Sequence, residues 1–404
     1  MANRRAGPES RGDNGQPRFA EFFSGIGLVR EALEPIGWRC VFANDIAPGK
    51  AEMYVERFGA DDLVVDDVNA LDIADLPLDL DLMTASFPCI DLSLAGKRAG
   101  LAGKHSGTIW PFLDLVEAQC RRTVPPLLLL ENVTGFLTSR GGRDLAAVCE
   151  RMAGLGYCID LAVIDARWFT PQSRPRLFVT AWRGSPERPA DRPPSRLRPP
   201  ALRRFQIAHP NLPFVDLAVP EPPLRAETHL VDLLEEVATD DERWWLRERT
   251  AEAVGSMNPR HRQRVDQLLA GQRDGVATLF RRRRNGRTVG EVRPDRIAGC
   301  LRTPQGGSSV QFLVDCRSGE ARIRPLTGRE YGRLQGAGDF PIAVGDRQAR
   351  MGFGDAVCVP AVRWLVEHTF LIFDEAVDDS QALPLAAAAS LHEPAEHQRE
   401  LFAP

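Results

Sequence analysis

The chain alternates short apolar runs with amphipathic stretches between Arg18 and Trp182, and this alternation restricts the folds open to it. The apolar runs are RFAEFF, RCVFANDI, LVVDDV, LDLDLMTASF, PLLLLENV, CIDLAVIDA and RLFVTAW. Apolar residues recur at helical spacing in the stretches between them, VREALEPIGW, PGKAEMYVERFG, SGTIWPFLDLVEAQCRR and RDLAAVCERMAGLG. Strands that alternate with helices in this way form parallel sheets with helices on both faces. We therefore predict an α/β fold with a doubly wound, Rossmann-like sheet.

The composition changes sharply after Arg183, where SPERPADRPPSRLRPP is too rich in proline for regular structure. Beyond it we expect one helix at residues 231–255, and strong patterning resumes only at RIRPLTGREYGRLQG. These changes divide the chain into a disordered lead-in at 1–17, a large domain at 18–183, a smaller inserted domain at 184–322, a return segment at 323–373 and a mobile acidic tail at 374–404.

The net charge of −4 results from two segments of opposite charge. Residues 374–404 contain seven acidic residues against one arginine, whereas residues 260–329 contain sixteen arginines against six acidic residues. A local positive surplus of this kind is typical of a surface that neutralises phosphates. Only Lys50, Lys97 and Lys104 are lysines, so nearly all of the positive charge comes from arginine.

The overall composition is that of an ordinary globular protein, with 43% hydrophobic and 26% charged residues. No apolar run approaches the roughly 20 residues that span a membrane. The N-terminal stretch MANRRAGPESRGDNGQPR lacks the apolar core of a signal peptide, so we expect a cytoplasmic protein without membrane contact. Its eight cysteines include no CxxC or Cys/His pairing of the kind that holds zinc, and we expect no bound metal.

Glycines and acidic residues stand at the ends of the first three apolar runs. The first run ends in FFSGIG and the second in Asp45; in a doubly wound fold, such glycines let a ligand approach the backbone and such an acid binds ribose hydroxyls. The pattern fits nicotinamide enzymes as well as S-adenosylmethionine enzymes, although Arg30 stands where GxGxxG has its third glycine. The third run ends in Asp66-Asp67-Val68, where a carboxylate either accepts from an adenine amino group or caps a helix.

A cysteine and a glutamate follow at the ends of the next two runs. Cys89 comes just past the fourth run, in SFPCIDLSLAGKRAG, and Glu131 ends the fifth run, in ENV. Both positions lie where such sheets bind their ligands. A thiolate there can attack carbon 6 of a cytosine while the acid protonates or hydrogen-bonds ring nitrogen 3. The remaining cysteines are interpreted as small buried hydrophobic residues.

Six segments follow one another along the chain: FFSGIG, SFPCIDLS, ENV, QSRPR, RPLTGREYGRLQG and GFGDAV. They resemble the successive motifs of the cytosine-5 DNA methyltransferase family, from about Phe19 to Phe370. The variable region that interrupts them, Gly184–Arg322, corresponds to the target-recognition domain of that family. The resemblance implies a bacterial enzyme that flips a cytosine out of DNA and transfers a methyl group from S-adenosylmethionine to carbon 5.

The resemblance also assigns roles to individual residues. Cys89 is the nucleophile, Glu131 engages the target base, and Arg174 and Arg176 of QSRPR contact the base and its phosphate. The residues expected to bind the cofactor are Phe23, Gly25, Ile26, Gly27, Asp45, Ile46, Asp67, Val68, Pro88, Asp355, Ala356 and Val357. The residues expected to contact DNA are Ser93, Arg281, Arg282, Arg283, Arg284 and Arg302.

Two positions depart from the family pattern. Ile90 follows the nucleophile where the family commonly has glutamine, which puts a polar contact there in question. Asp355 stands where the last motif usually has asparagine and adds a carboxylate near the cofactor pocket. A free thiol has a pKa of about 8.5, so we expect Arg174 or Arg176 to supply the positive field that Cys89 needs.

The run Arg281–Arg284 has two interpretations. It forms either a solvated charged loop or a set of phosphate contacts in the recognition domain, and the second interpretation is favoured. Trp244 and Trp245 are expected to anchor a helix to the core of this domain rather than to stack on bases.

Three other functions have to be weighed against DNA methylation. The same chemistry on RNA is one, since a branch of the family acts on transfer RNA, but the long basic variable region favours DNA. An oxidoreductase would use the glycine turn and Asp45 and leave Cys89 and Glu131 unexplained, and those two residues also argue against an idle DNA-binding relative. We therefore expect a monomer that methylates double-stranded DNA, with restriction or phage-defence proteins as partners.

Overall fold

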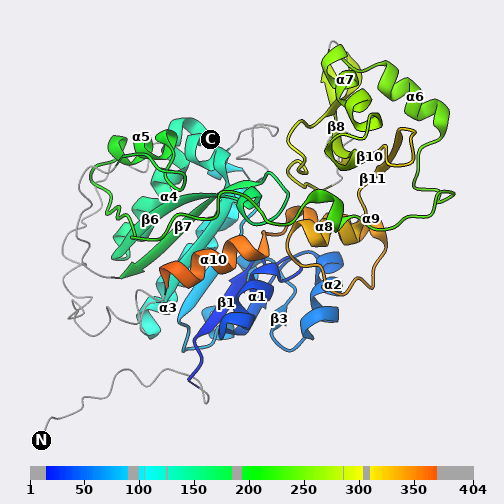
Figure 1. Cartoon of the computed structure of the whole chain (residues 1–404). Coiled ribbons are helices and arrows are strands. Elements are labelled where there is room, and N and C mark those ends of the chain that lie inside the picture. Colours follow the sequence, from blue (N-terminus) through cyan, green and yellow to red (C-terminus); the bar gives the residue numbers. More distant parts are fainter. Residues whose placement is uncertain are drawn as a thin grey trace, which may run out of the picture.

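The computed structural model of the chain describes residues 15–89, 100–103, 105–123, 126–183, 193–284, 286–303 and 310–370. Figure 1 shows two lobes, a large one around a seven-stranded sheet and a smaller one around a four-stranded sheet. Residues 1–14 of the predicted lead-in, the predicted tail at 374–404, Ile90 and Ser93 lie outside the described residues.

The large sheet has the strand order β3-β2-β1-β4-β5-β7-β6. Its strands are β1 (Arg18–Phe22), β2 (Arg39–Asn44), β3 (Leu63–Val64), β4 (Leu82–Ala85), β5 (Leu127–Val133), β6 (Tyr157–Asp165) and β7 (Pro175–Arg183). The first five strands pair in parallel, whereas β7 is antiparallel to both of its neighbours. The predicted α/β fold is confirmed, but the expectation of a wholly parallel sheet is wrong at β7. Only residues 166–174 connect β6 to β7, and a parallel crossover needs a dozen residues or more.

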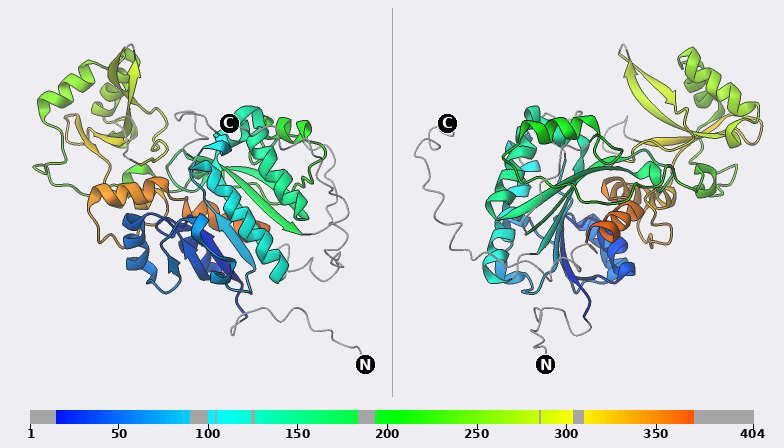
Figure 2. Two further views of the ribbon diagram at one scale, coloured as in Figure 1. Left: turned by 180° about the vertical axis from the view of Figure 1, so that it is seen from behind. Right: turned by 60° about the vertical axis from the view of Figure 1, so that its left-hand side comes forward.

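Helices cover both faces of this sheet. One face carries α1 (Leu28–Leu33), α2 (Pro48–Phe58) and α10 (Val359–Thr369), and the other carries α3 (Ile109–Arg122), α4 (Arg143–Gly154) and α5 (Pro200–Ala208). Figure 1 shows α1 and α10 in front of the strands, and the reverse view in Figure 2 shows α3 and α4. Side chains alternate along β1, so Phe19 packs in the first apolar cluster and Phe22 in the second. None of the helices in the described ranges is long and apolar enough to cross a membrane.

The segment around α5 packs against the edge of the large sheet. Phe205 is buried in the second apolar cluster, and Phe214 forms a β-bridge with Ile159 of β6. Arg198 is buried and lies 2.8 Å from the carboxylate of Asp160, which also belongs to β6. These residues were expected from the sequence at the start of the inserted domain, whereas their contacts here are with the large lobe.

The smaller lobe contains an antiparallel sheet of order β11-β10-β8-β9. Its strands are β8 (Val276–Arg284), β9 (Arg287–Val292), β10 (Gln311–Asp315) and β11 (Arg322–Pro325), and its helices are α6 (Arg247–Gly255) and α7 (Pro259–Leu269). Val265 and Leu268 of α7 pack on Leu279 and Phe312 of the sheet in an apolar cluster of its own. The lobe therefore has a separate hydrophobic core.

The helix expected at residues 231–255 is wrong in its first part. The helix α6 begins only at Arg247. Before it, the Asp241 carboxylate accepts a hydrogen bond from the Arg243 N–H (2.9 Å), and the Trp245 N–H donates to the Ile323 carbonyl of β11 (2.8 Å). These hydrogen bonds hold residues 241–245 in a turn and an extended segment. They outweigh the helical spacing of the apolar residues in this stretch.

The return segment brings α8 (Gly328–Leu334), α9 (Asp346–Asp355) and α10 back to the large lobe. A capping box begins α8, because Thr327 and Glu330 each accept a hydrogen bond from the backbone N–H of the other. Buried Arg324 pairs with the same glutamate. The helix α10 packs against α1, and α9 packs against α2, so residues from the two ends of the chain meet beside the first two strands.

Glu21 is an acidic residue inside the large lobe, on β1, and is 2% exposed. Its carboxylate accepts a hydrogen bond from the backbone N–H of Arg30 in α1 (3.2 Å). Burial nevertheless raises the pKa of Glu21 to about 8, because it outweighs this hydrogen bond and the charge of Arg30. Glu21 is therefore protonated in the folded protein at neutral pH, where an unfolded chain would ionise it.

Replacing Glu21 by glutamine should remove a loss of stability that occurs between the ordinary glutamate pKa and about pH 8. The folded-state pKa is raised, so the stabilising contribution is complete below the pKa of the unfolded chain and is lost as the pH rises towards 8. The free energy of unfolding of the native sequence should fall by at most about 1.4 kcal/mol per pH unit in this window. Urea unfolding of both proteins at several pH values measures the effect, and identical pH slopes would contradict it.

Candidate active site

Cys89 lies just beyond the end of β4, at the carboxyl edge of the large sheet. Two side chains hold the backbone before it: Asn132 Nδ2 donates to the Phe87 carbonyl (3.0 Å), and the Ser106 hydroxyl donates to the Pro88 carbonyl (2.8 Å). The thiol itself is half-buried. Its position is thus fixed by neighbouring elements at the edge where sheets of this type bind ligands.

Glu131 and Arg176 lie side by side on the neighbouring strands β5 and β7. Arg176 Nε is 2.9 Å from Glu131 Oε1, and both side chains are largely buried. Oε1 is ion-paired with this guanidinium and makes no other hydrogen bond among the described residues, so the carboxylate keeps acceptor capacity. A buried oxygen of this kind fits a hydrogen-bonding partner on a bound base.

The charges of this edge act on the Cys89 thiol. Burial raises the pKa of Cys89, Arg176 and Arg174 lower it, and Glu131 and Asp355 raise it, with a net increase over the ordinary value. The positive field expected from the two arginines is therefore present, but burial outweighs it. Cys89 is a protonated thiol at neutral pH in this state of the protein.

Arg174 uses its side chain to hold backbone. It is 3% exposed, and its Nη atoms donate to the carbonyls of Leu301 (2.8 Å), Gly354 (3.3 Å), Asp355 (3.3 Å) and Ala356 (2.7 Å). These carbonyls occupy the Nη donors, whereas the buried Nε of Arg174 has no hydrogen-bond partner among the described residues. The contact of Arg174 with the target base stays a prediction, whereas Arg176 lies directly beside Glu131.

Cys300 is a residue of the site that was not predicted from the sequence. Its Sγ lies 3.6 Å from Arg174 Nη1 and 3.7 Å from Arg176 Nη2. Burial raises the pKa of Cys300. The positive charges of Arg176, Arg174 and Arg302 together have the larger, opposite effect and lower the pKa to about 7. Cys300 meets these arginines only through the tertiary fold, and its one local signal in the sequence is the nearby Arg302.

The FFSGIG turn between β1 and α1 has the left-handed backbone that a close ligand requires. The angle φ is 55° at Phe23, 59° at Gly25 and 83° at Gly27. A Cβ atom at Gly27 would lie 2.6 Å from the ring of Phe58, so no larger residue fits there. Ile26, in contrast, is fully buried in the first apolar cluster.

The end of β2 lies next to this turn. The Asp45 carboxylate accepts hydrogen bonds from the N–H groups of Gly25 and Ala47, both at 2.8 Å, and each oxygen keeps a further lone pair. Ile46 is 62% exposed, which leaves an apolar surface uncovered. Ser24 Oγ is buried and has no hydrogen-bond partner among the described residues.

Asp67 and Val68 follow β3. The Asp67 carboxylate accepts from the Asn69 N–H (3.0 Å) and so caps the short 3-10 helix Val68–Ala70. Val68 is buried in the second apolar cluster. The helix cap foreseen as an alternative is thus present, and the contact of Asp67 and Val68 with adenine stays a prediction.

The end of α9 lies beside the glycine turn and the start of α2, and together these segments form the rim of the site. Asp355 is exposed and forms an ion pair with Lys50 of α2 (3.0 Å), and Val357 is buried. Because the charge of Asp355 acts on Cys89, the end of α9 and the Pro88-Cys89 turn share one rim.

The four consecutive arginines form the distal part of β8 rather than a loop. Arg281 stacks on the ring of Phe312 at 5.0 Å, whereas Arg282 and Arg284 pair with Glu291 of β9 at 3.4 and 2.9 Å. Arg282, Arg283 and Arg284 are exposed, and so is Arg302. Their contacts with DNA stay a prediction.

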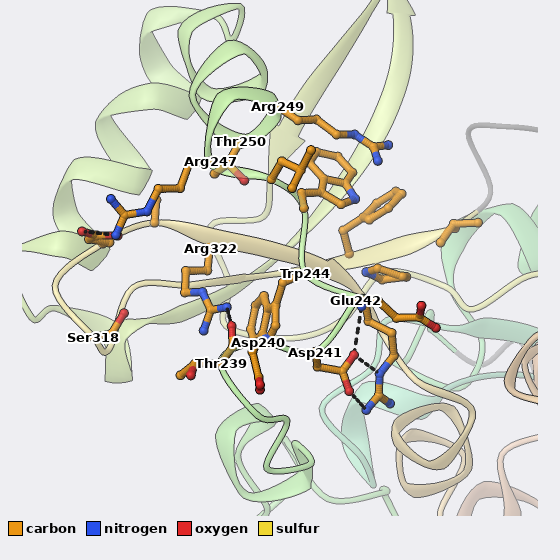
Figure 3. A pocket seen from close by; sticks show the side chains of 18 of the residues that line it. Thr239, Asp240, Asp241, Glu242, Trp244, Arg247, Arg249, Thr250, Ser318 and Arg322 are labelled. Atoms are coloured by element: carbon orange, nitrogen blue, oxygen red, sulfur yellow. Dashed lines mark hydrogen bonds and ion pairs between the residues drawn. The ribbon is translucent and has the colours of Figure 1, made fainter.

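A pocket of about 1110 Å³ lies elsewhere in the smaller lobe, around Trp244 (Figure 3). Arg322 lies over Trp244 at 4.2 Å, and Arg249 lies over Trp245 at 4.1 Å. Trp245 packs on Phe312 at 5.0 Å in the core of the lobe, as expected from the sequence. Both tryptophans therefore take part in packing.

No group of three or more His, Cys, Asp or Glu side chains suited to a metal ion occurs within the described ranges.

The fold and the site together define a class of protein. A Rossmann-like sheet with a glycine turn and an acid at the end of β2 is typical of proteins that bind nucleoside ligands, and a thiol at the same edge as a carboxylate is suited to nucleophilic chemistry. Residues 17–370 match the family of C-5 cytosine-specific DNA methylases. The chain belongs to this family and is a DNA cytosine-5 methyltransferase, which confirms the family and the enzyme class predicted from the sequence.

Known proteins resemble the chain over most of its length. The Type II methyltransferase M.HpaII of Haemophilus parainfluenzae is 28% identical over 354 residues, which cover 85% of this chain and 87% of the relative. M.NlaX of Neisseria lactamica is 28% identical over 355 residues, which cover 87% and 95%. The crystal structure of the S. pombe Dnmt2 methyltransferase has a TM-score of 0.57 at 18% identity, over 89% of this chain and 99% of that one. This last likeness shows a shared fold.

Cys300 should react with iodoacetamide faster than Cys89 in the protein without DNA. Alkylation follows the thiolate fraction, so the rate at Cys300 should rise with pH and level off above a pKa of about 7. Peptide mass spectrometry at successive times and pH values measures both sites. Cys300→Ser should remove the fast reaction, and a fast reaction located at Cys89 would contradict the assignment.

Proposed function

We propose that this methyltransferase acts through a covalent adduct between Cys89 and carbon 6 of a cytosine flipped out of double-stranded DNA, with S-adenosylmethionine as the methyl donor. The observation that carries the proposal is the meeting of three groups at one edge of the sheet. The Cys89 thiol lies in the field of Arg176 and Glu131, and buried Glu131 Oε1 makes no hydrogen bond among the described residues besides its ion pair with Arg176.

The reaction begins when the Cys89 thiol loses its proton to solvent. Burial opposes ionisation, and the positive charges of Arg176 and Arg174 favour it. The thiolate then bonds to carbon 6, and the electron pair of the 5,6 double bond moves to carbon 5. Glu131 takes up a proton from solvent when the base binds and holds it at ring nitrogen 3, which stabilises this charge. Carbon 5 takes the methyl group, and removal of its proton by a base re-forms the double bond and releases Cys89.

The rim beside β1 and β2 fits S-adenosylmethionine, which supplies an electrophilic methyl group when bound. Gly25 and Gly27 keep the first turn open to a close ligand, and the spare lone pairs of Asp45 suit ribose hydroxyls. The exposed side chain of Ile46 offers an apolar surface to adenine, and the unpartnered hydroxyl of Ser24 offers a hydrogen bond.

The setting of the enzyme follows from its relatives. Those with matches over most of the chain are named Type II methyltransferases, so we assign this chain to a restriction-modification system, in which methylation protects host DNA from the partner nuclease. The basic hairpin β8–β9 supplies phosphate contacts to the duplex.

Cys89→Ala should abolish methylation and leave cofactor and DNA binding intact, because only the covalent step needs sulfur. The native enzyme should form a denaturation-resistant adduct with DNA that carries 5-fluorocytosine, since fluorine blocks the release of Cys89. Glu131→Gln should form this adduct about 10² to 10⁴ times more slowly. Bisulfite sequencing of plasmid from a methylation-free host measures turnover, and substantial turnover by Cys89→Ala would contradict the mechanism.

Replacing Arg282, Arg283 and Arg284 together by alanine should weaken binding to all DNA sequences alike. The slope of log affinity against log salt should fall by about 0.9 for every phosphate that the variant no longer neutralises. Discrimination of the cognate site should survive, because phosphate contacts position the protein without reading bases. Arg281 is kept because it packs on Phe312.

A matched control is Arg247→Ala, which removes one positive charge from the same lobe. The side chain of Arg247 is 84% exposed. A triple variant with the salt slope of the native enzyme would assign the run to a solvated face. A triple variant that methylates new sites would place the arginines on the base-reading surface.

A further inference from the structure

Lys50 and Asp355 form an ion pair at the rim of the glycine turn. Lys50 Nζ is 3.0 Å from Asp355 Oδ2, and the two side chains are 26% and 46% exposed. A Cβ atom at Gly25 would lie 3.8 Å from Lys50 Cδ, so the lysine side chain runs along this turn. The charge of Asp45, and that of Cys89 when it is ionised, also acts on Lys50. The Lys50 ammonium group therefore lies near three parts of the site: the glycine turn, Asp45, which is expected to bind ribose, and Cys89.

The place of Lys50 in its helix is unfavourable for a cation. It stands in the first turn of α2, where backbone N–H groups carry partial positive charge and acidic residues are preferred. Its partner Asp355 stands where the family pattern has asparagine. The attachment of α2 to α9 does not require the pair, because Gln348 Nε2 already donates to the Gly49 carbonyl at 2.8 Å and to Glu52 at 2.7 Å.

We infer that Lys50 and Asp355 bind the amino-acid end of S-adenosylmethionine, Lys50 through the α-carboxylate and Asp355 through the α-ammonium group. The inference rests on the proposed function, because it takes the glycine turn and Asp45 as the cofactor site. The methionine end carries two opposite charges on one carbon atom, and the ion pair presents two complementary charges side by side. When the site is empty, the two side chains neutralise each other.

Each member of the pair needs the other for this task. Asp355 without a cation would repel the α-carboxylate, and its charge already raises the pKa of Cys89. Lys50 without an acid would leave an unbalanced positive charge at the N-terminus of α2. Together they recognise a zwitterion and keep the net charge of the rim unchanged when it binds.

Calorimetric titration of the full-length protein with S-adenosylhomocysteine and with 5′-methylthioadenosine tests the inference. Both ligands contain adenosine and sulfur, but only the first carries the amino-acid group. Lys50→Met should weaken S-adenosylhomocysteine binding about tenfold, as expected for one partly exposed charge-assisted hydrogen bond, and leave methylthioadenosine binding unchanged. Asp355→Asn should cause a smaller loss, because the amide oxygen still accepts from the ammonium group.

The matched control is Gln348→Met, which removes the neighbouring hydrogen bonds between α2 and α9 and should leave both affinities unchanged. Thermal unfolding checks that each variant folds, and Lys50→Gln replaces Lys50→Met if the latter does not. Equal losses for both ligands, or an unchanged affinity of Lys50→Met for S-adenosylhomocysteine, would overturn the inference and leave the cofactor site in place. Native protein that binds neither ligand would overturn the proposed function as well.

Discussion

The buried guanidinium of Arg174 joins parts of the site that are far apart in the sequence. Its Nη atoms donate to the carbonyl of Leu301 and to three consecutive carbonyls at residues 354–356. Its backbone N–H donates to the Asp165 carboxylate at 2.8 Å. A buried charge is costly unless its hydrogen bonds are made. Separating these segments from Arg174 would therefore expose its guanidinium or leave it buried without partners. The rim that combines the glycine turn with the end of α9 depends on this residue.

The same two arginines lie beside two thiols and give them opposite properties. They lower the pKa of Cys300 to about 7, because its Sγ is within 3.7 Å of both guanidinium groups. At Cys89 they only reduce the increase that burial causes, and Glu131 and Asp355 add to that increase. Cys89 is thus a protonated thiol at neutral pH, whereas Cys300 is partly ionised beside the arginines.

The sequence predicted the elements of the large sheet and the edge where the site lies, because hydrophobic periodicity and strand ends are local properties. It failed at β7, whose direction is set by the length of the connection 166–174 rather than by its own residues. It also failed before Arg247, where contacts with β11 override helical spacing. Cys300 and Lys50 escaped notice because their partners lie more than a hundred residues away in the chain. Asp355 was recognised as a departure, but its ion pair follows only from the packing of α9 on α2.

The segment 298–303 connects the smaller lobe to the chemistry of the larger one. The Ile297 carbonyl accepts from the Thr278 hydroxyl of β8 at 3.0 Å, which ties the base of the arginine hairpin to this segment. The Ala298 N–H then donates to the Pro171 carbonyl (2.7 Å), and Cys300 follows beside Arg174 and Arg176. One continuous run of chain therefore supports the strand that carries the basic residues and forms a wall of the site at Glu131. Any displacement of the smaller lobe would therefore move Cys300 relative to the two arginines whose charges act on Cys89.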